Sequence, residues 1–253
     1  MTPIPPLEPH VIVLIAAAGF IAGVQNALAG GGSFITFPAL LLAGLNPLAA
    51  NITSTIAMFP SQTTSAIAGR KLVDRVGPLS FRQMFMISLA GGLLGAILLL
   101  NTPATFFARL VPWLVLFATS VFAWGTFRRK PLHAASAMPL PLLVGVQSCI
   151  AIYGGYFGGG IGFLMLAALT VAGMQVRAAT ATKNVLAMAM NAAATLIFGF
   201  SHMISWPAAL ALAAGGIAGG VCGAWLIHRL PERLMRIFVV VIGALLTLWM
   251  FLR

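Results

Sequence analysis

The sequence predicts an all-α integral membrane protein made of two homologous repeats. Sixty per cent of the 253 residues are hydrophobic and only 7% are charged, whereas about a quarter of the residues in a soluble domain are charged. Apolar runs of about 20 residues, the length that crosses a bilayer as a helix, fill most of the chain. Blocks of sequence also recur at one fixed spacing. Composition and run length predict the membrane fold, and the recurring blocks predict the repeat.

Glycine-rich blocks carry the repeat. Residues 29–32 read AGGG and residues 157–160 read FGGG, an offset of 128. Residues 91–96 read GGLLGA and residues 219–224 read GGVCGA at the same offset. We interpret the second pair of blocks as close helix packing through small residues. Several agreements at one spacing indicate an internal duplication.

The duplication divides the chain near its middle. One residue is inserted between the glycine block of the second copy and Thr182, which matches Thr53 of the first copy. We therefore predict a first membrane repeat at 1–130 and a second at 131–253, which together form one transmembrane domain.

Each copy is expected to contain five segments, and these should be helices because backbone polar groups cannot be left bare in lipid. Four segments of each copy are long, and the one after the glycine block is short. The sequence thus predicts about eight long transmembrane helices and two short, broken helices. The segments are 11–29, 34–45, 47–69, 83–100 and 108–127 in the first copy, and 138–153, 161–173, 177–200, 206–227 and 234–252 in the second.

The placement of Lys and Arg predicts that the two copies are inverted. Basic residues gather in the loop after residue 69, at 128–130 and at 228–236, whereas the matching loops of the other copy carry few or none. Because basic loops stay on the cytoplasmic side, copies that exchange their basic loops have opposite orientations. Both termini would then lie outside. Eight plain helices with a weak charge bias are the alternative.

Composition excludes several functions. The formal net charge of +11 is spread over short loop clusters, without the basic stripe and interleaved aromatic residues of a nucleic-acid surface. There is no Walker loop, no cluster of metal ligands and no Ser–His–Asp set, so we expect no enzyme activity, no cofactor and no metal. The expected surroundings are a lipid bilayer and a small anionic substrate, and self-association into a homo-oligomer is left open.

The blocks AGGG at 29–32 and FGGG at 157–160 are the main candidate binding site. A short helix begins after each block, its first N–H groups have no intrahelical partners, and its dipole places partial positive charge there. Such a helix start inside a membrane protein favours an anion. Close helix packing is the alternative interpretation. The residues concerned are Gly30, Gly31, Gly32 and Ser33 in the first copy, and Gly158, Gly159 and Gly160 in the second.

Lys183 lies about six residues inside an apolar run, where a charge costs on the order of 2.5 kcal/mol or more. The acidic residues Glu8, Asp74 and Glu232 all lie at or beyond segment ends, which leaves a bound anion as the natural counter-charge. A lysine that reaches the interface is the alternative.

Uncharged side chains near these positions offer further hydrogen-bond donors to an anion. Each of them also suits interhelical hydrogen bonding, which is the alternative. The set predicted to line the site is Gln25, Asn26, Thr53, Ser54, Thr182 and Asn184, with Gln62 and Asn191 further along the same helices.

At these positions the chain resembles the TauE/SafE family of sulfite and organosulfonate exporters. The resemblance is carried by AGGGSFITFPALL at 29–41 and AANITST at 49–55, and by GGGIGFL at 158–164 and AATATKN at 178–184. It extends over essentially the whole chain. One departure is Ser33, which follows three glycines where relatives often have longer glycine runs, and this bears on the shape of the pocket.

The resemblance implies a secondary transporter of a sulfur oxyanion or an organosulfonate in the bacterial inner membrane. We expect one anion site at the interface of the two copies, with alternating access through rocking of one copy against the other. A passive anion channel of the same architecture is the first alternative. An intramembrane enzyme or a structural subunit is the second, although no catalytic set supports the former and duplication is unusual for the latter.

Overall fold

The computed structural model describes residues 8–28, 31–127, 139–226 and 232–252, and these residues form ten α-helices and no strand. Eight helices have 17 to 24 residues and two have 10 and 11 residues. The helices are α1 (Pro9–Leu28), α2 (Ser33–Leu42), α3 (Pro47–Gly69), α4 (Phe81–Leu100), α5 (Ala104–Phe127), α6 (Leu140–Tyr156), α7 (Ile161–Val171), α8 (Val176–Gly199), α9 (Trp206–Leu226) and α10 (Glu232–Leu252), with a 3₁₀ turn, η1 (Arg70–Leu72), after α3.

The helices follow the predicted order, long and short alike, and their ends agree with the predicted segments to within four residues. The predicted repeat boundary near residue 130 lies outside the described residues. Four of the described helices are long and apolar enough to cross a membrane, within 9–26, 81–100, 104–124 and 206–223. The chain is thus a multi-pass membrane protein by composition and length, and the number of crossings in each copy stays a prediction.

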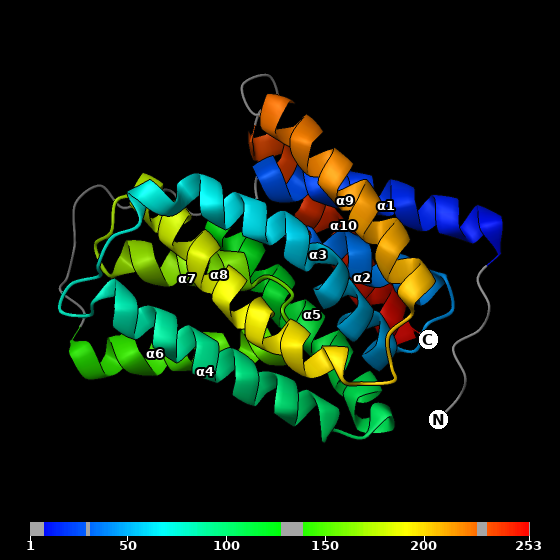
Figure 1. The fold of residues 1–253 in the computed structure, drawn as a ribbon, viewed down its shortest axis with the longest axis horizontal. Coiled ribbons are helices and arrows are strands. Elements are labelled where there is room, and N and C mark those ends of the chain that lie inside the picture. Colours follow the sequence, from blue (N-terminus) through cyan, green and yellow to red (C-terminus); the bar gives the residue numbers. More distant parts are fainter. Residues whose placement is uncertain (1–7, 29–30, 128–138, 227–231, 253) are drawn as a thin grey trace.

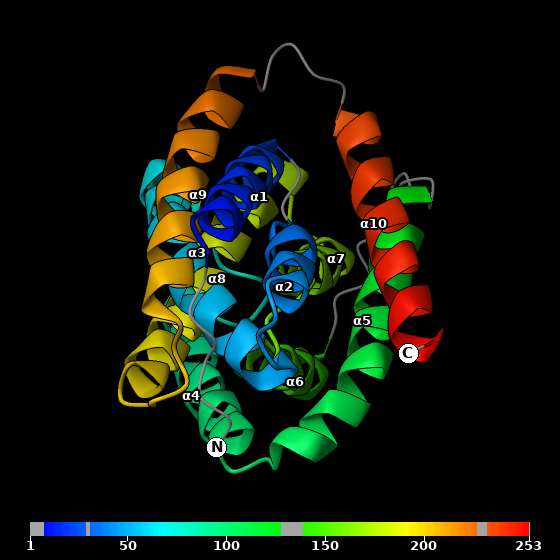
Figure 2. The same cartoon turned by 90° about the vertical axis from the view of Figure 1, so that its right-hand side faces the viewer.

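The two short helices lie in the middle of the molecule. Figure 2 shows α2 and α7 surrounded by long helices, with α1 and α9 on one side, α5 and α10 on another, and α4 and α6 on a third. The polar helices α3 and α8 pack against each other, and each also contacts the short helix of its own half. The long helices therefore enclose the two short helices.

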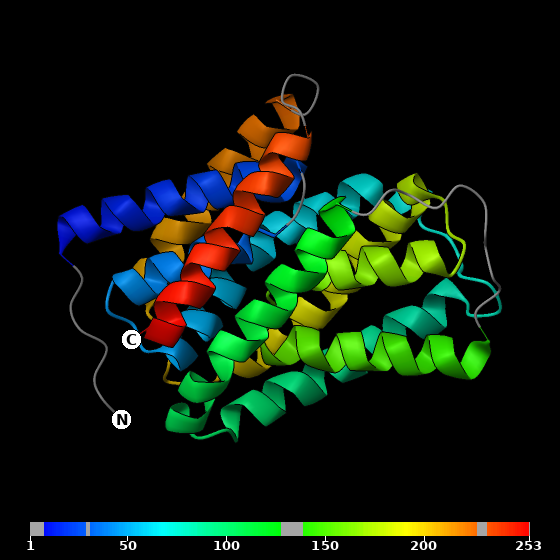
Figure 3. The same ribbon diagram turned by 180° about the vertical axis from the view of Figure 1, so that it is seen from behind.

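The helix contacts repeat between the halves. If α1–α5 are matched in order with α6–α10, the packing of α1 along α9 has its counterpart in the packing of α6 along α4. The contact of α10 with α2 likewise matches that of α5 with α7. In Figures 1 and 3, the pair α1 and α9 lies at one end of the molecule and the pair α4 and α6 at the other. Each half is therefore completed by helices of the other.

Glycines make the two most extensive of these contacts. A Cβ on Gly95 of α4 would collide with the backbone oxygen of Ile152 in α6, and a Cβ on Gly219 of α9 would collide with that of Phe20 in α1. Small residues let helix backbones approach this closely. The blocks GGLLGA and GGVCGA thus occupy equivalent interfaces, and the close contacts of Gly91, Gly95 and Gly219 confirm these three as packing positions.

Both short helices end in the same turn. The N–H of Leu45 donates to the carbonyl of Leu40 (3.1 Å), and the N–H of Met174 donates to that of Leu169 (3.0 Å). The glycines before them, Gly44 and Gly173, have φ of 89° and 94°, a left-handed conformation that ends helices at low cost in glycine. Since α2 has 10 residues and α7 has 11, the inserted residue of the second copy lies within its short helix.

Two adjacent glycines test the packing account. Gly219→Ala places a methyl group against the backbone of Phe20, whereas a Cβ on Gly220 has no atom within 4 Å. We expect Gly219→Ala to destabilise the protein by about 1–3 kcal/mol, the usual cost of overpacking, and Gly220→Ala to have no destabilising effect. Thermal unfolding of both variants in detergent measures the difference, and equal stabilities would contradict the proposed interface.

Candidate functional site

Each short helix begins at a glycine turn. In the first half Gly31 has φ of 83° and Gly32 is the residue before the helix. In the second half Gly158 and Gly160 have φ of 74° and 76°. Only glycine adopts these left-handed conformations without steric cost, so the glycine blocks allow the chain to turn sharply into α2 and α7. Gly30 lies outside the described residues.

Each of the two helix starts presents backbone N–H groups. The N–H of Phe34 donates to the carbonyl of Gly31 (3.0 Å), and the N–H of Phe163 donates to that of Gly160 (3.0 Å). Within the described residues, the N–H groups of Ser33 and Gly162 have no backbone acceptor. These are the groups that a helix start leaves without an intrahelical partner, and they carry the positive end of the helix dipole.

A cavity of about 50 Å³ lies between the two turns. A single water molecule requires about 10–15 Å³ measured in this way, so the cavity has room for a few water molecules or a small ion. Seven of the predicted site residues line it, namely Asn26, Gly31, Ser33, Gly158, Gly160, Lys183 and Asn184. The lining is completed by Gln62, Ser65, Ile161, Gly162 and Ala187. Residues from both halves therefore line the cavity.

The ammonium group of Lys183 lies at the start of α7. A Cβ built on Gly162 would be 3.6 Å from the Nζ atom of Lys183, and the lysine is only partly exposed. No Asp or Glu lines the cavity in the described part of the chain. A fixed positive charge and the positive end of a helix thus meet at one point, which favours a negatively charged ligand.

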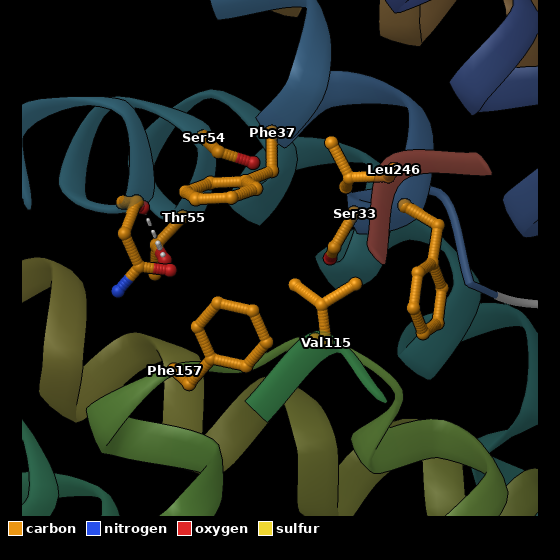
Figure 4. Close-up of a pocket in the computed structure, with 10 residues that line it drawn as sticks. Ser33, Phe37, Ser54, Thr55, Val115, Phe157 and Leu246 are labelled. Atoms are coloured by element: carbon orange, nitrogen blue, oxygen red, sulfur yellow. Dashed lines mark hydrogen bonds between the residues drawn. The ribbon is translucent and has the colours of Figure 1, made fainter. Parts of the chain in front are cut away.

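A second, smaller cavity of about 20 Å³ shares Ser33 with the first. Figure 4 shows the Ser33 side chain directed into the space bounded by Phe37, Val115 and Phe157. Two predicted site residues, Ser54 and Gly159, line this cavity instead of the larger one. The Ser54 hydroxyl lies 2.6 Å from that of Thr36, and the two share a hydrogen bond within the fold. The rings of Phe37 and Phe157 meet edge to face at 5.7 Å, so most of the wall is apolar.

Thr53 and Thr182, also predicted as ligands, line neither cavity. The Oγ1 atom of Thr53 accepts a hydrogen bond from the N–H of Ser205 (3.2 Å), and that of Thr182 accepts one from the N–H of Asp74 (3.2 Å). Ser205 precedes α9 and Asp74 precedes α4. Each threonine thus fixes the connecting loop of the opposite half, at positions that match between the copies.

Two further predicted residues lie away from the cavity linings. Gln25 is buried in α1, with 1% of its surface exposed. Gly32 packs against the same helix, where an added Cβ would be 2.8 Å from the carbonyl oxygen of Ala22. Both therefore belong to the wall behind the first glycine turn.

Sequence reasoning did not identify Ser65 or Ala187 as lining residues, whereas Ile161 and Gly162 lie at the helix start predicted after the second glycine block. Ala187 could have been found, since it lies one helical turn after Lys183 on the same face of α8. Gly162 extends the second glycine block by two positions. Ser65 belongs to the polar run SQTTS at 61–65, in which nothing distinguishes the side chain that faces inward.

Gln62 makes the interhelical hydrogen bond that was the alternative to a ligand-binding role, and it lies at the cavity. It lines the larger cavity, and its Oε1 atom accepts a hydrogen bond from the Nδ2 group of Asn191 (2.5 Å). Because Gln62 belongs to α3 and Asn191 to α8, this hydrogen bond joins the two halves directly beside the cavity.

Residues 15–250 match the family model described as "Sulfite exporter TauE/SafE". A "Probable membrane transporter protein" of Haemophilus influenzae is 29% identical over 242 residues, which cover 93% of this chain and 92% of the relative. "Probable membrane transporter protein ORF9" of Sinorhizobium sp. is 29% identical over 219 residues, 85% and 82% of the two chains. "Probable membrane transporter protein YfcA" of Escherichia coli K12 is 24% identical over 245 residues, 95% and 90% of the two chains. No solved structure matches the chain.

The loop anchors can be tested with substitutions that preserve shape. Thr53→Val removes the acceptor of a buried hydrogen bond and leaves the N–H of Ser205 without a partner, which costs about 1–3 kcal/mol. Thr53→Ser keeps the hydroxyl and should stay close to the wild type. Thermal unfolding in detergent distinguishes the two variants. A Thr53→Val protein as stable as Thr53→Ser would show that the hydrogen bond contributes nothing.

Proposed function

The chain belongs to the TauE/SafE family and is a membrane transporter, and we propose that it carries a small anion across the bacterial inner membrane as a secondary transporter. The anion we propose is a sulfur oxyanion such as sulfite, or an organosulfonate. The observation that carries this proposal is the cavity in which Lys183 meets the starts of α2 and α7.

The cavity presents positive charge and hydrogen-bond donors, which suit an anion. Lys183 and the positive ends of α2 and α7 line it, and no described lining residue is Asp or Glu. The oxygens of a sulfite or sulfonate group can accept hydrogen bonds from Lys183, from the N–H groups of Ser33 and Gly162, and from the amides of Asn26 and Asn184. Hydrogen bonds of this kind, with a charged partner, are about twice as strong as neutral ones.

The proposed transport cycle uses two inverted halves. In Figure 1 the connection between α3 and α4 lies at one end of the molecule, and its counterpart between α8 and α9 lies at the opposite end. The first connection contains Arg70, Lys71 and Arg75, whereas the second contains His202. Under the positive-inside rule this arrangement supports opposite orientations. Rocking of one half against the other would then open the cavity to each side in turn.

Side-specific labelling tests the inversion. Arg75 and His202 are both exposed, so Arg75→Cys and His202→Cys can be introduced singly into a Cys149→Ala, Cys222→Ala background. A membrane-impermeant thiol reagent should label His202→Cys in intact cells and Arg75→Cys only in inverted vesicles. Labelling of both positions from the same side would overturn the inverted arrangement.

Transport in proteoliposomes tests the role of Lys183. Lys183→Met removes one charge-assisted hydrogen bond, worth about 1.5–3 kcal/mol, so KM for the transported anion should rise about 10- to 100-fold. Lys183→Arg should retain part of the affinity. Lys71→Met, in an exposed loop, is the matched control and should transport like the wild type.

The same assay separates the carrier from a channel. Sulfite, thiosulfate, sulfate and sulfoacetate are offered in turn, and uptake should saturate and be accelerated by unlabelled anion inside the vesicles. If Lys183→Met left the uptake of every one of these anions unchanged, the result would contradict a binding site at Lys183. A flux that never saturates would instead support the anion channel.

A further inference from the structure

Gln62 and Asn191 occupy equivalent positions in the two halves. Both follow the matched threonines Thr53 and Thr182 by nine residues, one on α3 and the other on α8. Asn191 is buried, with 3% of its surface exposed, and its Nδ2 group donates to the Oε1 atom of Gln62 at 2.5 Å. Gln62 lines the larger cavity whereas Asn191 does not. Asn191 can therefore act on a ligand only through Gln62.

With the Asn191 amide oriented as in the structure, its NH₂ group donates to Gln62 and sets which end of the Gln62 amide faces the cavity. A glutamine side chain ends in an oxygen that accepts and an NH₂ group that donates. Since Asn191 holds the oxygen, the NH₂ group is the end left for the cavity. The opposite orientation would direct a carbonyl dipole at the ligand. The first arrangement suits an anion and the second a cation.

The spacing of residues along α8 explains why Asn191 contacts Gln62 without lining the cavity itself. Lys183, Ala187 and Asn191 are spaced by four residues and lie on one face of the helix. Asn191 is thus about 12 Å along the axis from Lys183, at a rise of 1.5 Å per residue. The first two line the cavity, and the third lies beyond its edge, where it contacts the side chain that α3 contributes.

We propose that Asn191 is a positioning residue that holds the amide of Gln62 with its NH₂ group toward the anion, and so sets the preference of the site for anions. This inference rests on the proposed transport of an anion. It assigns to the Gln62–Asn191 pair a role in affinity in addition to joining the halves.

A stability measurement without ligand tests the pairing itself. Gln62→Leu, Asn191→Leu and the double variant are unfolded by heat in detergent. If the two amides interact, the double variant should unfold at nearly the temperature of the single variants, since the second substitution removes nothing more. Two shifts that simply add would overturn the proposal, whatever the transported ligand.

A transport measurement tests the orientation. An aspartate at position 191 only accepts hydrogen bonds, so Asn191→Asp should turn the Gln62 amide round and present its oxygen to the anion. We expect KM for sulfite to rise about tenfold or more, with little change in the maximal rate, and Asn191→Leu should give a smaller rise because the amide can still rotate. Asn191→Asp with KM no higher than Asn191→Leu would overturn the orientation.

The charge of the new aspartate is controlled in a second background. In Gln62→Leu the amide is absent, so Asn191→Asp should raise KM further only by the repulsion between its carboxylate and the anion. An equal effect in both backgrounds would assign the whole change to charge and contradict the proposal. If the wild type binds and transports none of the anions offered, the proposed function fails, whereas an unchanged KM in an active Asn191→Asp protein refutes only the role of Asn191.

Discussion

Two helix starts enclosed within an apolar fold are the constraint on which the rest of the structure depends. The first N–H groups of a helix have no partners in the helix itself, and lipid provides none. The protein meets this constraint with glycine turns that bring both starts to one cavity, and with long helices that surround α2 and α7 (Figure 2). Lys183 adds a full positive charge at the same place. None of the described residues that line the cavity is Asp or Glu, and we propose that an anionic substrate binds there.

The halves share a framework but differ in chemistry. Ser54 occupies in α3 the position of Lys183 in α8, and Phe34 occupies in α2 that of Gly162 in α7. Around Ser54 the cavity is small, its wall is mostly aromatic or aliphatic, and the Ser54 hydroxyl is bonded to Thr36 (Figure 4). Around Lys183 the cavity is larger and polar. The two halves thus present equivalent positions with different side chains, and the position of Lys183 is the one at which we propose that an anion binds.

Much of the fold could be predicted because it follows from the length of apolar runs and from the glycine spacing. The site was harder, since neighbouring residues of a helix point about 100° apart at 3.6 residues per turn. Thr182 and Lys183 belong to one polar stretch, yet only the lysine lines the cavity and the threonine anchors a loop. Packing between the halves decides which face of a helix lines the cavity. A single sequence does not show how the halves pack.

The pair of Gln62 and Asn191 also shows what the sequence alone can and cannot predict about the site. Their equivalence in the repeat can be read from the sequence, but equivalent residues meet only where the two halves contact each other at matching positions. The contact between α3 and α8 fulfils this condition. Two donors that the sequence presents as separate candidates are therefore joined by a hydrogen bond in the structure, and only one of them, Gln62, lines the cavity.

The central claim is that an anion binds between the glycine turns, and a crystal structure with bound selenite tests it most directly. Selenite resembles sulfite, and its selenium atom can be located by anomalous scattering. The account predicts an anomalous peak in the cavity, within hydrogen-bonding reach of the Nζ atom of Lys183 and the N–H of Gly162. A peak at another place, or an empty cavity in crystals of protein that binds selenite in solution, would contradict it.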